Sequence, residues 1–567
     1  MLRSLFIPRI ALLAAVAGGL PSLFACLQHP LKPVELEIAR EDERMIDLTV
    51  NRDVDILFVM DNSGSMGDEQ GLLARNFGTF IDVLEDPEVA ANYRIGVTTT
   101  DSGNPACKTT GAEAGKLQMR SCRERTEQFV FDPGGINQND QTDVACLDNC
   151  PNRDLEILPS FAEDGETKPR KWLENQEGAL NIDADEWTTT EAFQCLGPMG
   201  INGCGFESQL ESMYKALRLT EYEGSDSFKF VRRNAILAVV IITDELDCSY
   251  NPDHGDIFTD DNTTFWLDPN DGPRSGICWE AGVECSGGGS PYDECHSANL
   301  DDDGDEVDEG DAGKDAVLHP ISRYINLLQG YENEKNEQNS QGQEVIVSVL
   351  GGVPHGYPAG DEPLNYFEET DETQAIQFGV VPGCLSQGGG RAYPPVRLRE
   401  WAEAFEIGGK INLFSICSDD YAPALKAIAD AIIEQITPAC FRRCAKEMDV
   451  AKDGLQTDCT ISEQAPGSDP RNLVECERDG DDEYEWEDEN YVVPEGEEAC
   501  YAVLSDKDDG KSDTDDRHDD METVCREEGW NLQFKLRRKP GSPGAPGTTV
   551  RATCQLSDMP EVDCPDI

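Results

Sequence analysis

The chain has 567 residues and carries 112 acidic against 46 basic side chains, which gives a formal net charge of −66. Such a charge argues against binding to nucleic acid and against lying flat on anionic lipid. The length allows two or three domains.

The N-terminus has the pattern of a targeting segment rather than of a folded element. Arg3 and Arg9 precede an apolar stretch at 10–20, which is typical of a signal peptide. Residues 23–26 (LFAC) resemble a bacterial lipobox, and this resemblance implies that 1–25 is a lipoprotein signal peptide. It further implies that Cys26 carries diacylglycerol and an acylated amine, which would anchor the protein to a membrane. The alternatives are an ordinary signal peptide or an uncleaved anchor.

The interpretation as a lipoprotein has consequences for location and for the rest of the chain. It implies that the protein lies in the envelope of a bacterium, anchored to the outer membrane. Whether the protein faces the periplasm or the cell surface does not follow from the sequence. A polar tether is expected at 26–49. No later stretch is long and apolar enough to span a bilayer.

Cysteine usage indicates an oxidising compartment. Without Cys26, an even number of the 21 cysteines remains, and they are spread over the whole exported chain. Zinc is less favoured, because there is no CxxC motif and the six histidines are scattered. Connectivity does not follow from sequence, but three close pairs could bridge locally: Cys146 with Cys150, Cys195 with Cys204, and Cys278 with Cys285.

Apolar runs alternate with amphipathic stretches between residues 50 and 437. This rhythm predicts a doubly wound, mostly parallel α/β sheet with two long disulfide-rich insertions, at about 101–200 and 246–313. The first insertion is expected to contain the domain's third strand or a substitute for it. Strands are expected at 54–60, 93–99, 236–244, 344–350 and 411–416, and helices at 67–84, 207–219, 316–328, 397–405 and 421–436.

The most informative motif follows the first of these strands. Asp61, Ser63 and Ser65 stand at alternate positions after an apolar run, with Gly64 allowing a tight turn. At the carboxyl edge of a parallel sheet these oxygens can converge, and they suit Mg²⁺ or Ca²⁺. The alternative is a polar cap that opens the helix starting near Gly67.

This Asp-x-Ser-x-Ser pattern resembles the metal-ion-dependent adhesion site (MIDAS) of von Willebrand factor type A (vWA) domains. The resemblance implies that Asp244, at the end of a second buried strand, completes the site. It also implies a threonine ligand from a loop that corresponds to 203–217, where this chain has none. Glu207 or Ser208 would have to serve instead; if Glu207 points outward, it is an ordinary acid of the first helical turn.

A second cation candidate lies at 299–308, NLDDDGDEVD. Its alternating oxygen ligands resemble the start of EF-hand and thrombospondin calcium loops, although the twelfth position is a glycine. One register uses Asn299, Asp301 and Asp303, with Gly304 sixth. A second register, as in Asp-rich bacterial calcium repeats, uses Asp301, Asp303, Asp305 and Asp308. The alternative is a solvated acidic loop.

The character of the chain changes after residue 437. The region 438–567 is acidic and rich in cysteine, and 531–538 and 548–556 alternate apolar with polar residues around a Gly/Pro-rich loop. We therefore expect a small, mostly β appendage with these two segments paired. The alternative is a partly disordered acidic tail.

These features favour a binding protein over an enzyme. The vWA resemblance implies that a divalent cation bridges the protein to a protein ligand that presents a carboxylate. A structural envelope protein with merely stabilising cations is the alternative. A secreted hydrolase is less favoured, because HExxH, GxSxG and GxxxxGK[ST] motifs are all missing from the sequence.

Overall fold

The structure is a computed structural model that divides into two units, residues 1–44 and 45–567. The first unit lies outside the described residues, and with it Cys26 and most of the expected tether. The description covers 45–560 except for these positions: 51, 87–88, 90, 132–138, 271, 289–290, 339–343, 408, 437–439, 442, 449–454, 466–467, 480–482, 488–489, 506–519, 522–524, 527–529, 540–541 and 543–547.

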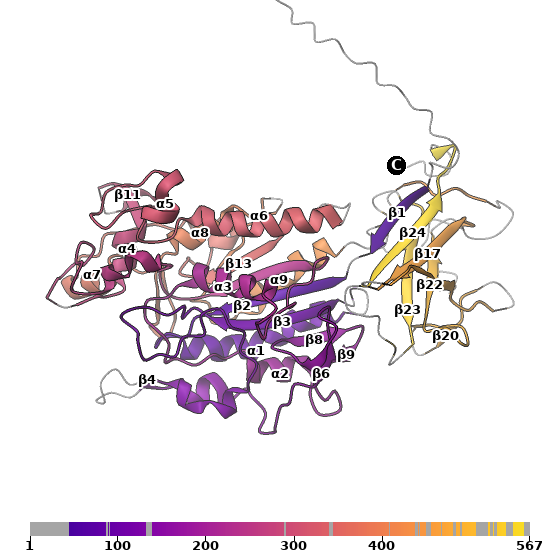
Figure 1. Ribbon diagram of the computed structural model, residues 1–567, viewed down its shortest axis with the longest axis horizontal. Coiled ribbons are helices and arrows are strands. Elements are labelled where there is room, and N and C mark those ends of the chain that lie inside the picture. Colours follow the sequence, from indigo (N-terminus) through magenta and orange to yellow (C-terminus); the bar gives the residue numbers. More distant parts are fainter. Residues whose placement is uncertain are drawn as a thin grey trace, which may run out of the picture. The chain divides into compact units, whose positions relative to one another are not determined.

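A seven-stranded sheet with flanking helices forms the mixed α/β part of the chain (Figure 1). Its order is β16-β13-β10-β2-β3-β8-β9, and the first five of these strands run parallel. The last two strands, β8 and β9, come from the first insertion, and the pairs β3–β8 and β8–β9 are antiparallel. The strands are β2 (Asp53–Met60), β3 (Asn92–Thr99), β8 (Leu173–Gln176), β9 (Ala179–Leu180), β10 (Ile236–Ile242), β13 (Ile346–Gly351) and β16 (Leu413–Ser415).

Two groups of helices accompany this sheet. In one group α1 contacts α2 and α9, and in the other α6 contacts α3 and α8. The helices are α1 (Gly67–Leu84), α2 (Thr189–Leu196), α3 (Gln209–Glu221), α6 (Ile321–Gln338), α8 (Val396–Glu403) and α9 (Ala422–Gln435). The helix expected from 316 begins five residues later, because Leu318 bridges to Tyr250 and Pro320 precedes the first turn.

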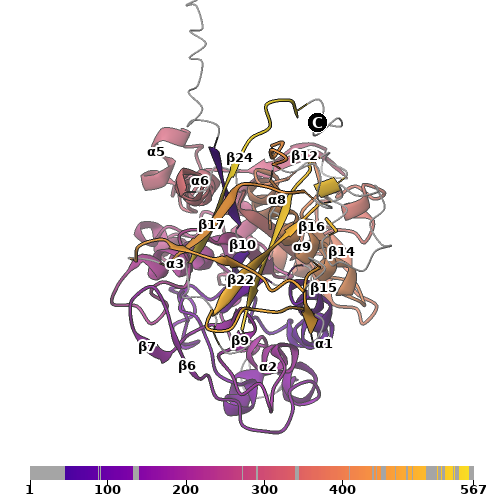
Figure 2. The same cartoon turned by 90° about the vertical axis from the view of Figure 1, so that its right-hand side faces the viewer.

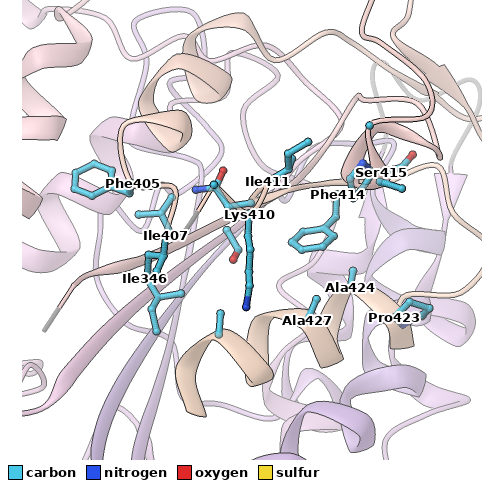
Figure 3. A pocket seen from close by; sticks show the side chains of 18 of the residues that line it. Ile346, Phe405, Ile407, Lys410, Ile411, Phe414, Ser415, Pro423, Ala424 and Ala427 are labelled. Carbon is cyan, nitrogen blue, oxygen red and sulfur yellow. The ribbon is translucent and has the colours of Figure 1, made fainter. Parts of the chain in front are cut away.

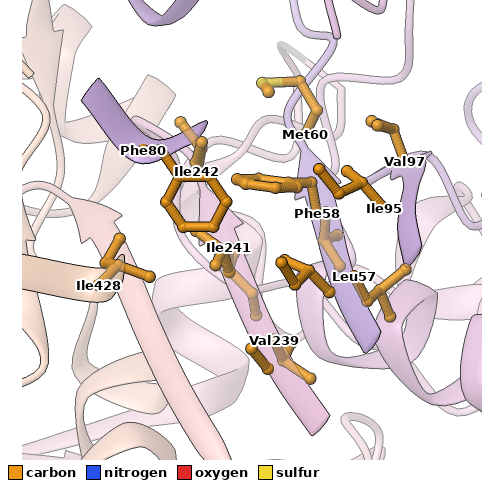
Figure 4. Packing of buried hydrophobic residues seen from close by; sticks show 14 of the residues in the cluster. Leu57, Phe58, Met60, Phe80, Ile95, Val97, Val239, Ile241, Ile242 and Ile428 are labelled. Carbon is orange, nitrogen blue, oxygen red and sulfur yellow. The ribbon is translucent and has the colours of Figure 1, made fainter. Parts of the chain in front are cut away.

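Apolar strands buried on both faces hold the core together (Figure 4). Every residue of β2 and β10 is buried, as expected for parallel strands covered on both sides. Phe58 of β2 meets the rings of Phe77 and Phe80 on α1 at centroid distances of 5.8 and 5.9 Å. The apolar face of α1 is thereby fixed directly beside the strand that leads into the Asp61 loop.

The two insertions and the loop between β13 and α8 carry short elements, and the second insertion shares with this loop a hydrophobic cluster that includes Trp266, Trp279 and Tyr393. Their helices and turns are η2 (Cys122–Glu124), η3 (Thr126–Phe129), η4 (Asp143–Leu147), η5 (Pro252–Phe258), α4 (Gly276–Gly282), α5 (Glu309–Asp315), η6 (Tyr357–Ala359) and α7 (Glu372–Phe378). Their strands are β4 (Val130–Phe131), β5 (Asn139–Asp140), β6 (Pro159–Phe161), β7 (Thr167–Pro169), β11 (Val283–Gly287), β12 (Tyr292–Ser297), β14 (Cys384–Leu385) and β15 (Arg391–Ala392).

Disulfides staple the insertions and the C-terminal region, and the three local pairs considered from sequence are wrong. Each of those six cysteines bonds elsewhere, because the fold brings more distant partners together. Every described cysteine is disulfide-bonded, which is typical of an exported protein. The bonds that join two described cysteines are Cys107–Cys204, Cys122–Cys146, Cys150–Cys195, Cys248–Cys278, Cys285–Cys295, Cys384–Cys417, Cys440–Cys525, Cys459–Cys554 and Cys476–Cys500.

The C-terminal region forms small antiparallel and mixed sheets (Figure 2). One sheet has the order β1-β24-β17-β18, and a second has the order β19-β22-β23. The strands are β1 (Met45–Val50), β17 (Cys459–Gln464), β18 (Arg471–Asn472), β19 (Val474–Glu475), β20 (Trp486–Glu487), β21 (Asn490–Tyr491), β22 (Ala499–Leu504), β23 (Gln533–Arg538) and β24 (Thr549–Gln555).

Two expectations about this region are corrected. The alternating segments are strands, but β23 pairs with β22 whereas β24 pairs with β1 and β17, so they do not pair with each other. The expected tether also ends before residue 49, because β1 is an edge strand of the sheet β1-β24-β17-β18. No helix in the described part of the chain is long and apolar enough to cross a bilayer.

Candidate metal centre

The neighbouring strands β2 and β10 bring the two predicted aspartates to one edge of the sheet. They are parallel and in register, with Met60 opposite Ile242. The backbone N–H of Asp61 donates to Ile242 O at 2.9 Å. Asp61 and Asp244 therefore leave the sheet at adjacent strand ends, where ligands bind in open α/β sheets.

The Asp61 loop gathers its oxygens on one side. Asp61 Oδ1 accepts the backbone N–H of Ser63 at 2.8 Å, and Oδ2 accepts the Thr243 hydroxyl at 2.6 Å. The hydroxyls of Ser63 and Ser65 are 3.1 Å apart. The capping alternative is wrong, because the N-cap residue of α1 is Met66, which makes no side-chain capping hydrogen bond.

Gln70 fastens this loop to the first insertion, and sequence reasoning missed it. Its Nε2 donates to Asp61 O at 2.8 Å and to Gly200 O at 2.7 Å. Its Oε1 accepts the N–H groups of Met199 and Gly200 at 2.8 and 3.2 Å. The available signal was a polar residue on the otherwise apolar, core-facing side of α1.

A close backbone approach joins the loop before α3 to the same turn. Gly203 N–H donates to Asn62 O at 2.8 Å. A Cβ on Gly203 would lie 2.2 Å from Asn62 Oδ1, so any other residue there would displace the Asn62 side chain. The disulfide between Cys107 and Cys204 holds this loop in place.

Glu207 points inward, which settles the two orientations considered from sequence. It lies in the loop before α3 and is 1% exposed. The Thr100 hydroxyl donates to its Oε2, and Oε1 has no hydrogen-bond partner among the described residues. Ser208 is directed elsewhere, since its hydroxyl donates to Cys248 O at 2.8 Å.

The site concentrates negative charge. Burial raises the pKa of Asp61, and burial together with the charge of Asp61 raises the pKa of Asp244 and of Glu207 well above the usual range. Burial also raises the pKa of Glu245 to about 8 and that of Glu69 to about 7. Buried carboxylates without a positive partner resist ionisation, and a bound cation removes that resistance.

The chemistry of these groups fits a hard divalent cation. One carboxylate oxygen each on Asp244, Glu207, Glu245 and Glu69 lacks a partner within the part of the chain that the structure describes. All candidate donors are oxygens, which Mg²⁺ and Ca²⁺ prefer. Within the same residues, no three His, Cys, Asp or Glu side chains are gathered closely enough to hold a metal by themselves. The predicted set needs only two carboxylates, because Ser63 and Ser65 supply hydroxyls.

The first insertion and the loop between β13 and α8 both contribute to the rim of this site. Asn139 Nδ2 donates to Gly64 O at 3.1 Å, and a Cβ on Gly64 would lie 2.9 Å from the Phe131 ring. On the other side, Tyr393 N–H donates to Asp244 O at 2.8 Å. Loops that surround a site in this way are the usual determinants of specificity.

The second cation candidate folds as a compact turn. Asp301 Oδ1 accepts the N–H groups of Asp303 and Asp305, both at 3.0 Å, and Gly304 takes a φ of 84°. Asn299 Nδ2 bonds to Glu309 Oε2 at 2.9 Å. The side chains of Asp303, Asp305 and Asp308 are exposed. Calcium binding here stays a prediction, because turn geometry of this kind also forms without an ion.

A separate cavity lies between β13, β16 and α9 (Figure 3). Its volume is about 810 Å³, and its walls are largely apolar, with Ile346, Phe405 and Phe414 among them. Lys410 reaches into it and pairs with Glu434 at 2.5 Å. None of the predicted cation ligands lines this cavity.

Comparisons with known proteins add little to what the geometry of the site shows. No protein-family model and no curated protein matches the chain. Among solved structures, the chain is similar to the pilus adhesin SpaC of Lactobacillus rhamnosus GG in its open conformation, with 8% identity and a TM-score of 0.27. It is also similar to the pilus adhesin RrgA of Streptococcus pneumoniae, with 10% identity and a TM-score of 0.25.

These alignments cover 90% and 91% of this chain but only 40% and 58% of the two adhesins. The chain thus spans about half the length of the adhesins it matches. At such TM-scores the likeness carries no argument about the fold or the function. The case for a function rests on the site alone.

Proposed function

We propose that the α/β part of this chain is a doubly wound vWA-like domain that binds a divalent cation and, through it, a protein ligand. Asp61, Ser63, Ser65 and Asp244 would hold Mg²⁺ or Ca²⁺. A cation held there supplies a positive contact for a carboxylate of the partner. The insertions at the rim would select that partner.

One observation carries the proposal: two buried aspartates at the ends of adjacent parallel strands lie at the same edge of the sheet as the hydroxyls of Ser63 and Ser65. The bond between Thr243 and Asp61 and the contact between Ser63 and Ser65 orient this set. In addition, Asp244 Oδ1 has no partner within the described residues. Leaving buried carboxylates unpaired is costly, so a cation is the group that this arrangement suits.

The test is cation-dependent binding. Cell adhesion or pull-down is measured with the purified exported protein, with and without EDTA, and with Asp61→Ala. We expect both EDTA and the substitution to abolish binding. Asp82→Ala, which removes an exposed acid from the far end of the same helix, is the control and should bind normally. Unchanged binding in EDTA and in Asp61→Ala would reject recognition through a metal.

The alternative is a structural envelope protein whose cations only stabilise the fold. It predicts a melting temperature that rises with calcium or magnesium, with no partner recovered from cells. Ser65 favours the adhesive role, because this ligand is exposed while Asp61 is fully buried, so the site opens outward at the serine.

We further propose that the protein is a bacterial lipoprotein anchored through Cys26, with palmitate or a similar acyl chain at its N-terminus. The motif at residues 23–26 supports this, and so do the disulfides, which are typical of an exported protein. Radiolabelled palmitate should enter the wild-type protein and not Cys26→Ser. Equal labelling of both would exclude the anchor.

A further inference from the structure

We propose that Glu207 is a built-in third carboxylate of the cation site, and that it makes this site a calcium site that keeps its ion without a partner. The inference rests on the proposed function, because it concerns the same site. It specifies that the cation is calcium and that the protein retains this ion when no partner is bound.

The loop before α3 presents Glu207 to the site through a short chain of contacts. Thr100 follows β3, and its N–H donates to Met60 O, at the end of β2, at 3.1 Å. The hydroxyl of Thr100 then donates to Glu207 Oε2. The Glu207 carboxylate therefore lies beside the strand end from which Asp61 emerges.

The backbone on both sides of Glu207 is fixed. Its carbonyl accepts the N–H of Cys248 at 2.6 Å, and Ser208 N–H donates to Thr100 O at 3.1 Å. Its side chain is 1% exposed and Oε1 has no partner among the described residues, so this buried oxygen is unsatisfied. No salt bridge within the described residues reaches this carboxylate, so a cation is its natural counter-charge.

Ligation by Glu207 requires its side chain to rotate. The three carboxylates of Asp61, Asp244 and Glu207 are not gathered at one point in this structure. Only Oε2 is engaged, by one hydroxyl, which leaves Oε1 free to turn toward the ion. The short side chain of a serine or threonine would contribute no charge in this place.

An additional carboxylate changes which cation is preferred. Calcium accepts six to eight oxygen ligands in irregular arrangements and binds more tightly as the ligand charge rises. Magnesium demands regular octahedral geometry and keeps several waters. Three carboxylates and two hydroxyls from three separate loops suit calcium. The three carboxylates also leave less positive charge to attract an acidic partner. Because they neutralise the ion themselves, the ion stays bound in the absence of that partner.

The experiment compares Glu207→Gln and Glu207→Thr with wild type in the full exported chain. Calcium and magnesium affinities are measured by titration calorimetry, and bound water is counted from the luminescence lifetimes of Tb³⁺. We expect each variant to lose at least about tenfold in calcium affinity and to admit about one more water on Tb³⁺. We also expect both variants to bind magnesium about as well as wild type.

Two controls give the result its meaning. Glu211→Gln makes the same change on α3, where Glu211 is buried but engaged by Tyr324 at 3.1 Å and Arg323 at 3.4 Å. It should leave calcium affinity unchanged. In EDTA, Glu207→Gln should melt at or above the wild-type temperature, because it replaces an unpartnered buried carboxyl group by a neutral amide of the same shape. A melting temperature lowered equally with and without calcium would show a structural role only and overturn the inference.

The outcomes separate this inference from the proposed site. If Asp61→Ala abolishes calcium binding while Glu207→Gln binds like wild type with the same water count, Glu207 is no ligand and the site stands. If wild type binds no cation, or if Asp61→Ala binds as wild type does, the site and the inference fall together.

Discussion

Replacing Gln70 by leucine should weaken both the fold and the cation site, because four hydrogen bonds of this carboxamide tie the Asp61 loop to the first insertion. Leucine has nearly the same size, so packing changes little. It removes four hydrogen bonds at 2.7–3.2 Å and leaves backbone groups of Asp61, Met199 and Gly200 unpaired. At about 1 kcal/mol for each bond, the loss is about 4 kcal/mol.

The assay is urea unfolding in EDTA, followed by tryptophan fluorescence, on wild type and Gln70→Leu. The matched control is Asn76→Leu, on the same helix, where one bond to Leu72 O at 2.9 Å is lost. The control should lose no more than about 1 kcal/mol. Calcium affinity should fall in Gln70→Leu and hold in Asn76→Leu. A loss as small as that of the control would refute the idea that Gln70 fastens the loop.

Two further predictions concern the loop before α3 and the pH dependence of stability. Gly203→Ala places a Cβ 2.2 Å from Asn62 Oδ1 and should lower the calcium affinity measured by calorimetry. The control Gly205→Ala, whose Cβ would have nothing within 4 Å, should leave that affinity unchanged. Equal calcium affinities of the two variants would contradict this prediction. Burial lowers the pKa of His319 to about 3 from 6.5. As pH falls, the unfolded chain therefore takes up a proton on this imidazole at a higher pH than the folded chain does. The free energy of unfolding accordingly decreases as the pH drops from 6.5 toward 3. His319→Gln should flatten that decline in melting temperature, and parallel curves would contradict it.

The central strands were predictable because parallel strands buried on both faces must be apolar throughout. Residues 56–60 and 236–242 have that composition, and an acid follows each run, Asp61 directly and Asp244 after Thr243, so the edge that carries these two aspartates was visible in advance. Glu207 could be placed in the site only as one of two alternatives. Its direction depends on Thr100 and on the loop that Cys204 anchors, and both contacts are distant in sequence.

The insertions resisted prediction for a related reason. Residues 173–176 are short and polar in part, yet they form β8 because the open edge of β3 accepts them. The pairing of Cys107 with Cys204 spans 97 residues, and no local spacing signals it. The strands β1 and β24 pair through their backbones, and their paired residues are 500 to 510 positions apart, so no local pattern of side chains indicates this pairing.

Local chemistry can be read from the order of residues. It includes the apolar strands, the turn with its aspartate and serines, the excess of acidic over basic side chains and the density of cysteine. These properties depend on neighbours a few positions away. Which strand lies beside which, which cysteines meet and whether Glu207 faces Asp61 depend on contacts between distant segments. Such contacts form only when the whole core is packed, because each is stabilised by burial that no single segment achieves by itself.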